Sequence, residues 1–87
     1  MAYDSILDAL GDPTRRRILE ALRAGPLSVS DLAQTQVVSR PAVSQHLKAL
    51  LDCNLVSFRA EGTRRVYALA PDGMTSVSLW VDQFWNP

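Results

Sequence analysis

Hydrophobic residues recur with the 3.6-residue period of amphipathic helices along most of this chain. Apolar side chains at three- and four-residue intervals predict helices over residues 3–10, 14–23 and 73–85. Asp12 precedes Pro13, which is the order of an N-cap followed by a proline at the first helical position. The pattern therefore predicts two helices at the start of the chain and one at its end.

Two further helical patterns lie between residues 28 and 51, separated by a short turn. Ser28 and Ser39 stand where these helices begin, and each can accept a backbone hydrogen bond as an N-cap. The second helix has one apolar stripe, which consists of Val43, Leu47 and Leu50. Its opposite face carries hydrogen-bonding and cationic side chains, which are Ser44, Gln45 and Lys48. This arrangement predicts a helix-turn-helix whose second helix enters the major groove of DNA.

The hydrophobic period changes to two beyond Asn54, a residue suited to a left-handed helix end. Residues 55–59 and 65–69 alternate in the manner of strands, and residues 60–64 contain the glycine of a hairpin connection. The basic residues at this turn are Arg59, Arg64 and Arg65, against the single acid Glu61. A basic hairpin after a helix-turn-helix is typical of a wing that contacts the DNA backbone. The alternative is an edge hairpin that charge protects from aggregation.

The predicted order of elements is four helices, a β-hairpin and a final helix. The fold class is therefore mainly α with a small β-hairpin, a winged helix-turn-helix in one domain that spans residues 1–87. Within this domain, the helix-turn-helix covers about residues 28–51 and the wing about residues 55–69.

The overall charge at first argues against a nucleic-acid partner, because nine basic and nine acidic side chains give 87 residues a net charge of zero. The distribution of charge reverses that argument. Residues 40–65 hold five basic and two acidic side chains, a charge of +3, and the rest of the chain carries the balancing −3. Double-stranded DNA is therefore the expected partner. The residues expected to contact it are Ser39, Arg40, Ser44, Gln45, His46, Lys48, Arg59, Arg64 and Arg65.

Three side chains allow two interpretations each. His46 lies about 60° from the apolar stripe of its helix, so it either donates to a DNA phosphate or packs as a half-buried residue. Arg16 and Arg17 either contact phosphates or belong to a solvated helix face, in which Glu20 has the spacing of an ion pair with Arg16 or Arg23.

The predicted last helix is richer in large apolar side chains than one face of a small domain requires. A chain of this size buries only about 60–65% of its unfolded surface, so extra apolar surface favours association. Together the first helix, about residues 3–10, and the last helix, about residues 73–85, predict a two-fold homodimer. The alternative is that both helices complete the core. The expected interface residues are Tyr3, Ile6, Leu7, Leu10, Met74, Val77, Trp80, Val81, Phe84 and Trp85.

Five stretches of the chain carry a specific resemblance. They are Leu10 to Leu19, Gly25 to Ala33, Leu55 to Val56, Glu61 to Tyr67, and Val38 to Leu50 with its string Ser-Arg-Pro-Ala-Val-Ser-Gln-His-Leu-Lys. Together they closely resemble the ArsR family of winged helix-turn-helix repressors, over nearly the whole chain. The resemblance implies a homodimer joined by its first and last helices, which binds an operator near its own promoter and is released by a signal.

The metal-sensing members of that family carry a Cys-x-Cys motif in the first helix of the helix-turn-helix, or Asp and His ligands in the last helix. Here residues 28–34 contain no thiol, and residues 74–86 contain Asp82 but no histidine. The chain is therefore similar to the branch that senses no metal. Neither a metal nor a cofactor is expected. Regulation by an unidentified small molecule, by a partner protein or by simple autoregulation stays open.

Other functions have weaker support. The single cysteine, Cys53, is best explained as a small residue at a helix end, and a metal or redox sensor through this thiol is one alternative. A winged-helix protein-interaction module that does not read DNA is another. No catalytic arrangement or glycine-rich phosphate loop is visible, so an enzyme is not expected. The chain has neither an apolar run of about 20 residues nor a basic signal-peptide start, which predicts a cytoplasmic location.

Overall fold

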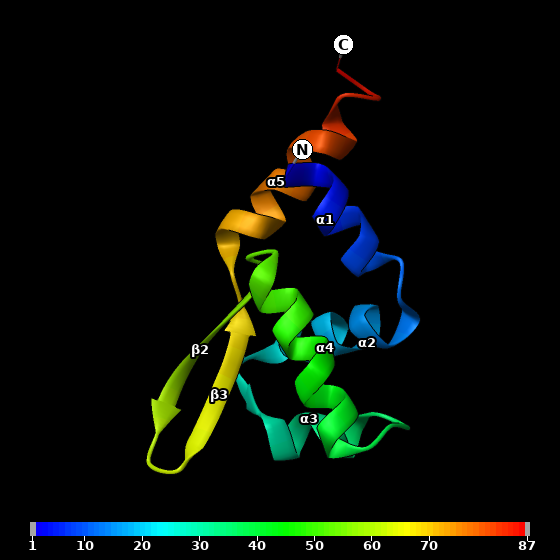
Figure 1. Ribbon diagram of the computed structural model, residues 1–87. Coiled ribbons are helices and arrows are strands. Elements are labelled where there is room, and N and C mark those ends of the chain that lie inside the picture. Colours follow the sequence, from blue (N-terminus) through cyan, green and yellow to red (C-terminus); the bar gives the residue numbers. More distant parts are fainter. Residues whose placement is uncertain (1, 87) are drawn as a thin grey trace.

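The chain forms an elongated molecule of 46 × 24 × 23 Å, with a β-hairpin at one end and the last helix at the other (Figure 1). This computed structural model describes the backbone of residues 2–86 and the side chains of residues 4–86. The elements are α1 (Ala2–Leu10), α2 (Pro13–Ala21), the short 3₁₀ helix η1 (Leu22–Ala24), β1 (Leu27–Ser28), α3 (Val29–Thr35), α4 (Arg40–Asp52), β2 (Val56–Glu61), β3 (Arg64–Leu69) and α5 (Pro71–Asp82). The predicted fold class, mainly helical with a small hairpin, is confirmed.

Short polar side chains fix where three of the helices begin. The Asp12 carboxylate accepts hydrogen bonds from two backbone N–H groups in the first turn of α2, at 2.8 and 3.1 Å. Ser28 Oγ accepts one such bond in α3 at 3.1 Å, and Ser39 Oγ accepts one in α4 at 3.3 Å. Each bond satisfies an N–H group that has no partner inside its helix, so the predicted N-caps are confirmed. Helix α2 is shorter than predicted, because the chain tightens into η1 after Ala21.

The C-terminal end of α4 is a left-handed turn at Asn54. This residue has a φ of 59°, and its N–H donates to the Leu51 carbonyl at 3.0 Å. The N–H of Leu55 donates to the Leu50 carbonyl, also at 3.0 Å. These two bonds form a Schellman motif, which satisfies carbonyls that the helix leaves open. The chain passes from this turn directly into β2, so the helix end determines where the hairpin starts.

Three antiparallel strands form the sheet in the order β1-β3-β2. The sequence pattern does not predict β1, because two residues are too few to show a period of two. The hairpin loop is also shorter than predicted, since the ladder continues to the pair of Glu61 and Arg64 and leaves only Gly62 and Thr63 unpaired. Gly62 has a φ of 60°, as the first central residue of a type II′ turn requires.

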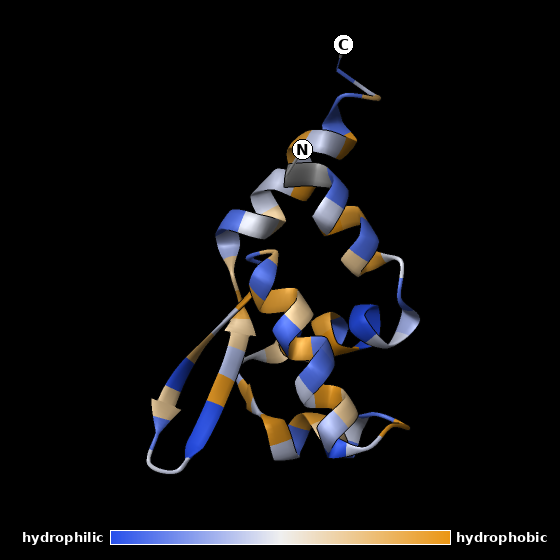
Figure 2. Ribbon diagram, in the orientation of Figure 1, coloured by the Kyte–Doolittle hydropathy of each residue, from blue (hydrophilic) through white to orange (hydrophobic). Residues whose placement is uncertain are grey.

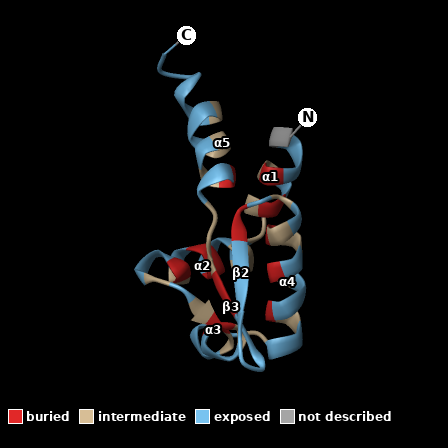
Figure 3. Ribbon diagram, turned by 90° about the vertical axis from the view of Figure 1, so that its left-hand side faces the viewer, coloured by how far each residue is buried: buried red, intermediate tan, exposed pale blue. Residues whose placement is uncertain are grey.

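The hydrophobic core lies between the sheet and the helices α2, α3 and α4 (Figures 2 and 3). Its largest fully buried side chains are Ile18, Leu32, Val43, Leu47, Leu50 and Leu55. The apolar stripe predicted for α4 is therefore confirmed, because all three of its residues are 0% exposed. In the described part of the chain, no helix is long and apolar enough to cross a membrane.

Helix α5 projects away from this core, and its one buried residue is Gly73. The N–H of Gly73 donates to the Asn54 carbonyl at 3.1 Å, and a Cβ at this position would collide with the same carbonyl. The missing side chain thus lets the start of α5 rest on the end of α4. The helix ends at Asp82, before the predicted residue 85, because the N–H groups of Phe84 and Trp85 donate to carbonyls three residues back.

Candidate nucleic-acid interface

The buried stripe of α4 fixes the rotation of this helix about its own axis. Because that stripe faces the core, the side chains of Ser44, Gln45 and Lys48 are all exposed, as predicted from their positions. An amide can pair with adenine in the major groove, and an ammonium group can pair with guanine or with a phosphate. The exposed face of α4 therefore has the chemistry needed to read base edges.

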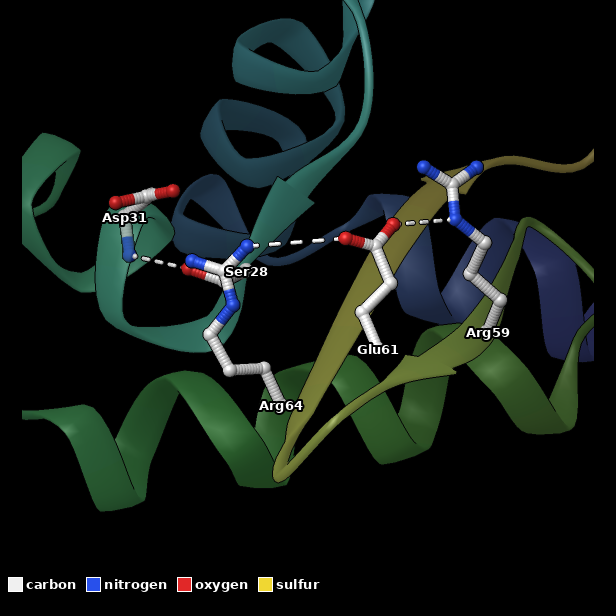
Figure 4. A network of polar contacts seen from close by, with 5 residues as sticks. All are labelled: Ser28, Asp31, Arg59, Glu61 and Arg64. Atoms are coloured by element: carbon white, nitrogen blue, oxygen red, sulfur yellow. Dashed lines mark hydrogen bonds and ion pairs between the residues drawn. The ribbon is translucent and has the colours of Figure 1, made fainter.

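The hairpin separates its three arginines onto two faces. Arg59 and Arg64 share one face with Glu61, whose carboxylate oxygens lie 2.7 Å from Arg59 Nε and 3.9 Å from Arg64 Nη2 (Figure 4). Arg65 lies on the opposite face, with its guanidinium 4.6 Å from the centre of the Phe58 ring. The positive charge of the wing is thus partly balanced on one face and stacked on an aromatic ring on the other.

A groove of about 320 Å³ lies between the hairpin tip and the N-terminal ends of α3 and α4. Its lining residues are Ser28, Val29, Ser30, Arg40, Thr63, Arg64 and Arg65. The groove brings Arg40 together with two arginines of the wing. Arginine side chains and hydroxyl groups are the kinds of donor that bind the oxygens of a phosphate. The sequence pattern gives no sign of Ser30 or Thr63 as site residues, because they belong to different elements and become neighbours only in the fold.

The three consecutive arginines at the start of α2 form hydrogen bonds with three different partners. Arg15 Nε donates to His46 Nδ1 at 3.2 Å, which ties α2 to α4. Arg16 Nη1 donates to the Leu10 carbonyl at 2.6 Å, and Arg17 Nη2 donates to a threonine hydroxyl of its own helix at 3.4 Å. His46 is half-buried. Of these three arginines, Arg15 is therefore the one that contacts a predicted site residue, His46. The sequence pattern does not mark Arg15 itself as a site residue.

Known proteins are similar to this chain in both sequence and fold. The model of the arsR family of bacterial regulatory proteins matches residues 12–57, from the N-cap of α2 into β2. The HTH-type transcriptional regulator Rv2034 of Mycobacterium tuberculosis is 52% identical over 83 residues, which are 95% of this chain and 78% of that protein. This chain belongs to the arsR family.

Two more similarities place the arsR-family chain among regulators of known architecture. The transcriptional repressor SdpR of Bacillus subtilis is 30% identical over 83 residues, which are 95% of this chain and 92% of that protein. The solution structure of the homodimeric winged helix-turn-helix DNA-binding domain Mb0332 from Mycobacterium bovis is similar with a TM-score of 0.80 and 27% identity, over 98% of this chain and 79% of that one. The chain is a winged helix-turn-helix transcriptional regulator.

Among the described residues of this arsR-family chain, four of the six exposed large apolar side chains lie on α5 or just beyond it. Val81, Phe84 and Trp85 are 40, 64 and 75% exposed. Leu79, which is 57% exposed, belongs to the same surface but was not among the predicted interface residues. The ring of Trp80 meets that of Phe84 edge-on, with centroids 5.0 Å apart. This aromatic surface is open to solvent in the single chain.

The other predicted interface residues lie closer to the core. Ile6 is 5% exposed and packs inside its own chain. The half-buried members are Leu7, Leu10, Met74 and Val77. The side chain of Tyr3 lies outside the described residues.

Cys53 is half-buried at the end of α4, where its thiol donates to the Ser5 carbonyl at 3.3 Å. Burial, and then the neighbouring Asp52 carboxylate, raise the pKa of this thiol above its ordinary value. A raised pKa disfavours the thiolate, which is the form that binds metals and reacts with oxidants. The contact with Ser5 joins α4 to α1.

Proposed function

We propose that this arsR-family chain represses transcription as a homodimer that binds a palindromic DNA site. The observation that carries the proposal is the position of the exposed face of α4. That face lies at the same end of the molecule as the hairpin tip, where the groove is lined by three arginines (Figure 1). The side chains suited to base edges and those suited to phosphates therefore lie at the same end of the folded molecule.

In this proposal α4 enters the major groove. Gln45 pairs with adenine, and Lys48 pairs with guanine or a phosphate. Ser44 can hydrogen-bond to adenine or to guanine. Ser39 and Arg40 flank the groove at the N-terminal end of α4. The wing arginines and His46 contact the DNA backbone, which sets the register of the helix without reading sequence.

The dimer is proposed to form through α1 and α5. The exposed side chains of Phe84 and Trp85 support this assignment, because large aromatic residues dominate the energetics of protein interfaces. Two copies bring a charge of +3 each from residues 40–65 to the DNA. They also set two α4 helices at a separation that matches half-sites about 34 Å apart.

The signal that releases the DNA is proposed to be something other than a metal or an oxidant acting at Cys53. The raised pKa of the thiol and its hydrogen bond to Ser5 support this view. DNA affinity should then be the same with Zn²⁺, with a chelator and with an oxidant. A change of affinity in any of these three conditions that Cys53→Ser abolishes would contradict it.

Selection of bound sequences from random DNA, followed by anisotropy titrations at several salt concentrations, tests the roles of the residues. Gln45→Ala should weaken binding to the selected site by about 1–3 kcal/mol and leave binding to scrambled DNA unchanged. Arg64→Ala should weaken binding to both DNAs alike and lower the salt slope by about one.

Two outcomes count against the proposal. If both variants lose affinity equally on the selected and scrambled DNA, the assigned roles are wrong. If the wild type retains no DNA fragment at about 150 mM salt, the chain is a protein-interaction module and not a DNA reader.

A further inference from the structure

Arg15 and His46 form a half-buried contact between α2 and α4. The Nε–H of Arg15 donates to Nδ1 of His46 at 3.2 Å. The side chain of His46 makes no other hydrogen bond within the described part of the chain. The one polar contact of this ring is therefore made by a residue of another helix.

The chemistry of the two groups determines where the proton of the imidazole lies. A guanidinium group has five N–H donors, no acceptor, and a charge that persists throughout the pH range of folded proteins. The Nδ1 atom of His46 must therefore present its lone pair to Arg15. In a neutral imidazole the proton is then on Nε2. The contact thus selects one tautomer and leaves the Nε2–H group as the free donor of the ring.

Within the described part of the chain, no acid accepts a hydrogen bond from His46. The carboxylate of Asp12 is an acid on which both Arg15 and His46 act electrostatically. Its Oδ1 atom accepts the backbone N–H groups of Thr14 and Arg15, at 2.8 and 3.1 Å, and neither of its oxygens is hydrogen-bonded to the imidazole. The Nε2–H group of His46 is therefore available to a partner outside the chain.

We propose that Arg15 is a positioning residue for DNA binding: it holds His46 as the Nε2–H tautomer, and that N–H donates to a phosphate of the DNA backbone. His46 follows Gln45 on α4, so its ring lies at the border between the buried stripe and the exposed face. A donor at this border fits a backbone contact and not a base contact. The inference rests on the proposed function, because it needs α4 to be the helix that meets DNA.

Arg17 provides a matched control for Arg15. It carries the same charge on the same helix, two residues away, but its guanidinium donates to Thr14 Oγ1 at 3.4 Å and does not contact His46. Replacement of either arginine by methionine removes one positive charge and keeps most of the aliphatic length. Arg15→Gln removes the charge and keeps an N–H donor within reach of His46.

The tautomer is read first, in the full chain, by two-bond ¹H–¹⁵N correlation spectra of the imidazole nitrogens. The expected spectrum shows a protonated Nε2 and an unprotonated Nδ1 in the wild type and in Arg15→Gln. In Arg15→Met the ring should lose this preference and populate both tautomers. A wild-type spectrum with the proton on Nδ1 would overturn the inference and leave the proposed DNA binding untouched.

DNA affinity is then measured on the selected site. Arg15→Met should lose about tenfold, Arg15→Gln should recover most of that loss, and Arg17→Met should lose only about twofold from its missing charge. In a His46→Phe background, Arg15→Met should cost no more than Arg17→Met.

Three results would contradict this expectation in different ways. Equal losses for Arg15→Met and Arg17→Met would mean that Arg15 acts only through its charge. A His46→Phe protein that binds DNA like the wild type would remove His46 from the interface while DNA binding itself stands. A wild-type chain that binds no DNA would overturn the proposed function, whatever the tautomer.

Discussion

The two ends of the molecule use their apolar residues in opposite ways. At the end formed by α3, α4 and the hairpin, the stripe of α4 is fully buried, and the large apolar residues still exposed are Val37 and Phe58. At the other end, α5 buries only Gly73, and Phe84 and Trp85, which follow the end of α5 at Asp82, are exposed (Figure 3). Amphipathic sequence alone does not distinguish these cases. The difference is that one face of α4 packs against three elements, α2, α3 and β2, whereas α5 packs mainly against α1.

The largest effect should come from emptying the buried end. Leu47→Ala removes a side chain that is 0% exposed, so we expect a loss of about 2–5 kcal/mol in the free energy of unfolding. Leu79→Ala makes the same chemical change at a residue that is 57% exposed and should change monomer stability by less than about 1 kcal/mol. Urea unfolding at low protein concentration measures both. Equal losses for the two variants would mean that the two ends do not differ in how they bury their apolar residues.

The next effect concerns association through the aromatic end. Replacing Phe84 and Trp85 together by alanine should raise the dimer dissociation constant by about thirtyfold or more, because both side chains are largely exposed in the single chain. Sedimentation equilibrium measures this constant. Val37→Ser provides the control, since it removes an apolar side chain that is 100% exposed at the opposite end. If the double replacement changes the dissociation constant no more than Val37→Ser does, the interface lies elsewhere.

A side chain at Gly73 should weaken the contact between the start of α5 and the end of α4. A Cβ there would collide with the Asn54 carbonyl, so Gly73→Ala must shift the start of α5 or the end of α4. We expect a loss of about 1–3 kcal/mol in the free energy of unfolding. Gly11→Ala is the milder control, because its Cβ would lie 3.3 Å from the nearest backbone oxygen. If Gly73→Ala is as stable as the wild type, the close contact does not limit α5.

The balance of charge at the hairpin should have a smaller effect. Glu61→Gln frees Arg59 and Arg64 from their shared carboxylate, so DNA affinity should rise by about two- to fivefold and the salt dependence should steepen. The increase should be the same on specific and scrambled DNA, because the wing contacts backbone. Asp31→Asn removes an exposed acid at α3 that has no ion pair among the described residues, and serves as the control. An unchanged affinity for Glu61→Gln would mean that the carboxylate does not restrain these arginines.

The smallest effect is a pH dependence at Asp12, between the two ends. Backbone hydrogen bonds, that from Arg15 first, lower the pKa of this carboxyl below its ordinary value of about 4. The ionised form therefore stabilises the folded chain above that value, and the contribution is lost as pH falls through the folded pKa. Asp12→Asn keeps the cap without the charge, so its stability difference from the wild type should shrink below about pH 4 in thermal unfolding. A difference that stays constant with pH would contradict the assignment.

Local signals in the sequence were sufficient for most of the helices. Asp12, Ser28 and Ser39 each accept the backbone bonds that their positions predict, because capping depends only on residues two or three apart. The left-handed φ of Asn54 follows from the same short range. The hairpin loop was predicted too long, because its last pairs depend on contacts across the strands and not on a pattern within either one.

The candidate site could be predicted only in part. The exposed positions of Ser44, Gln45 and Lys48 follow from helical period once the apolar stripe is known. The contact of Arg15 with His46 joins residues 31 positions apart, and the groove joins α3, α4 and the hairpin tip. Neither arrangement has a spacing that a sequence pattern can reveal.

The sequence by itself determined the order of elements, the caps, the buried stripe of α4 and the placement of positive charge in residues 40–65. These features depend on neighbours within a few residues or on simple composition. Only the tertiary structure decided that Glu61 offsets two wing arginines, that Arg15 contacts His46, and that the aromatic residues Phe84 and Trp85 beyond α5 are exposed. Each of these depends on which elements pack together, and packing is a property of the whole chain.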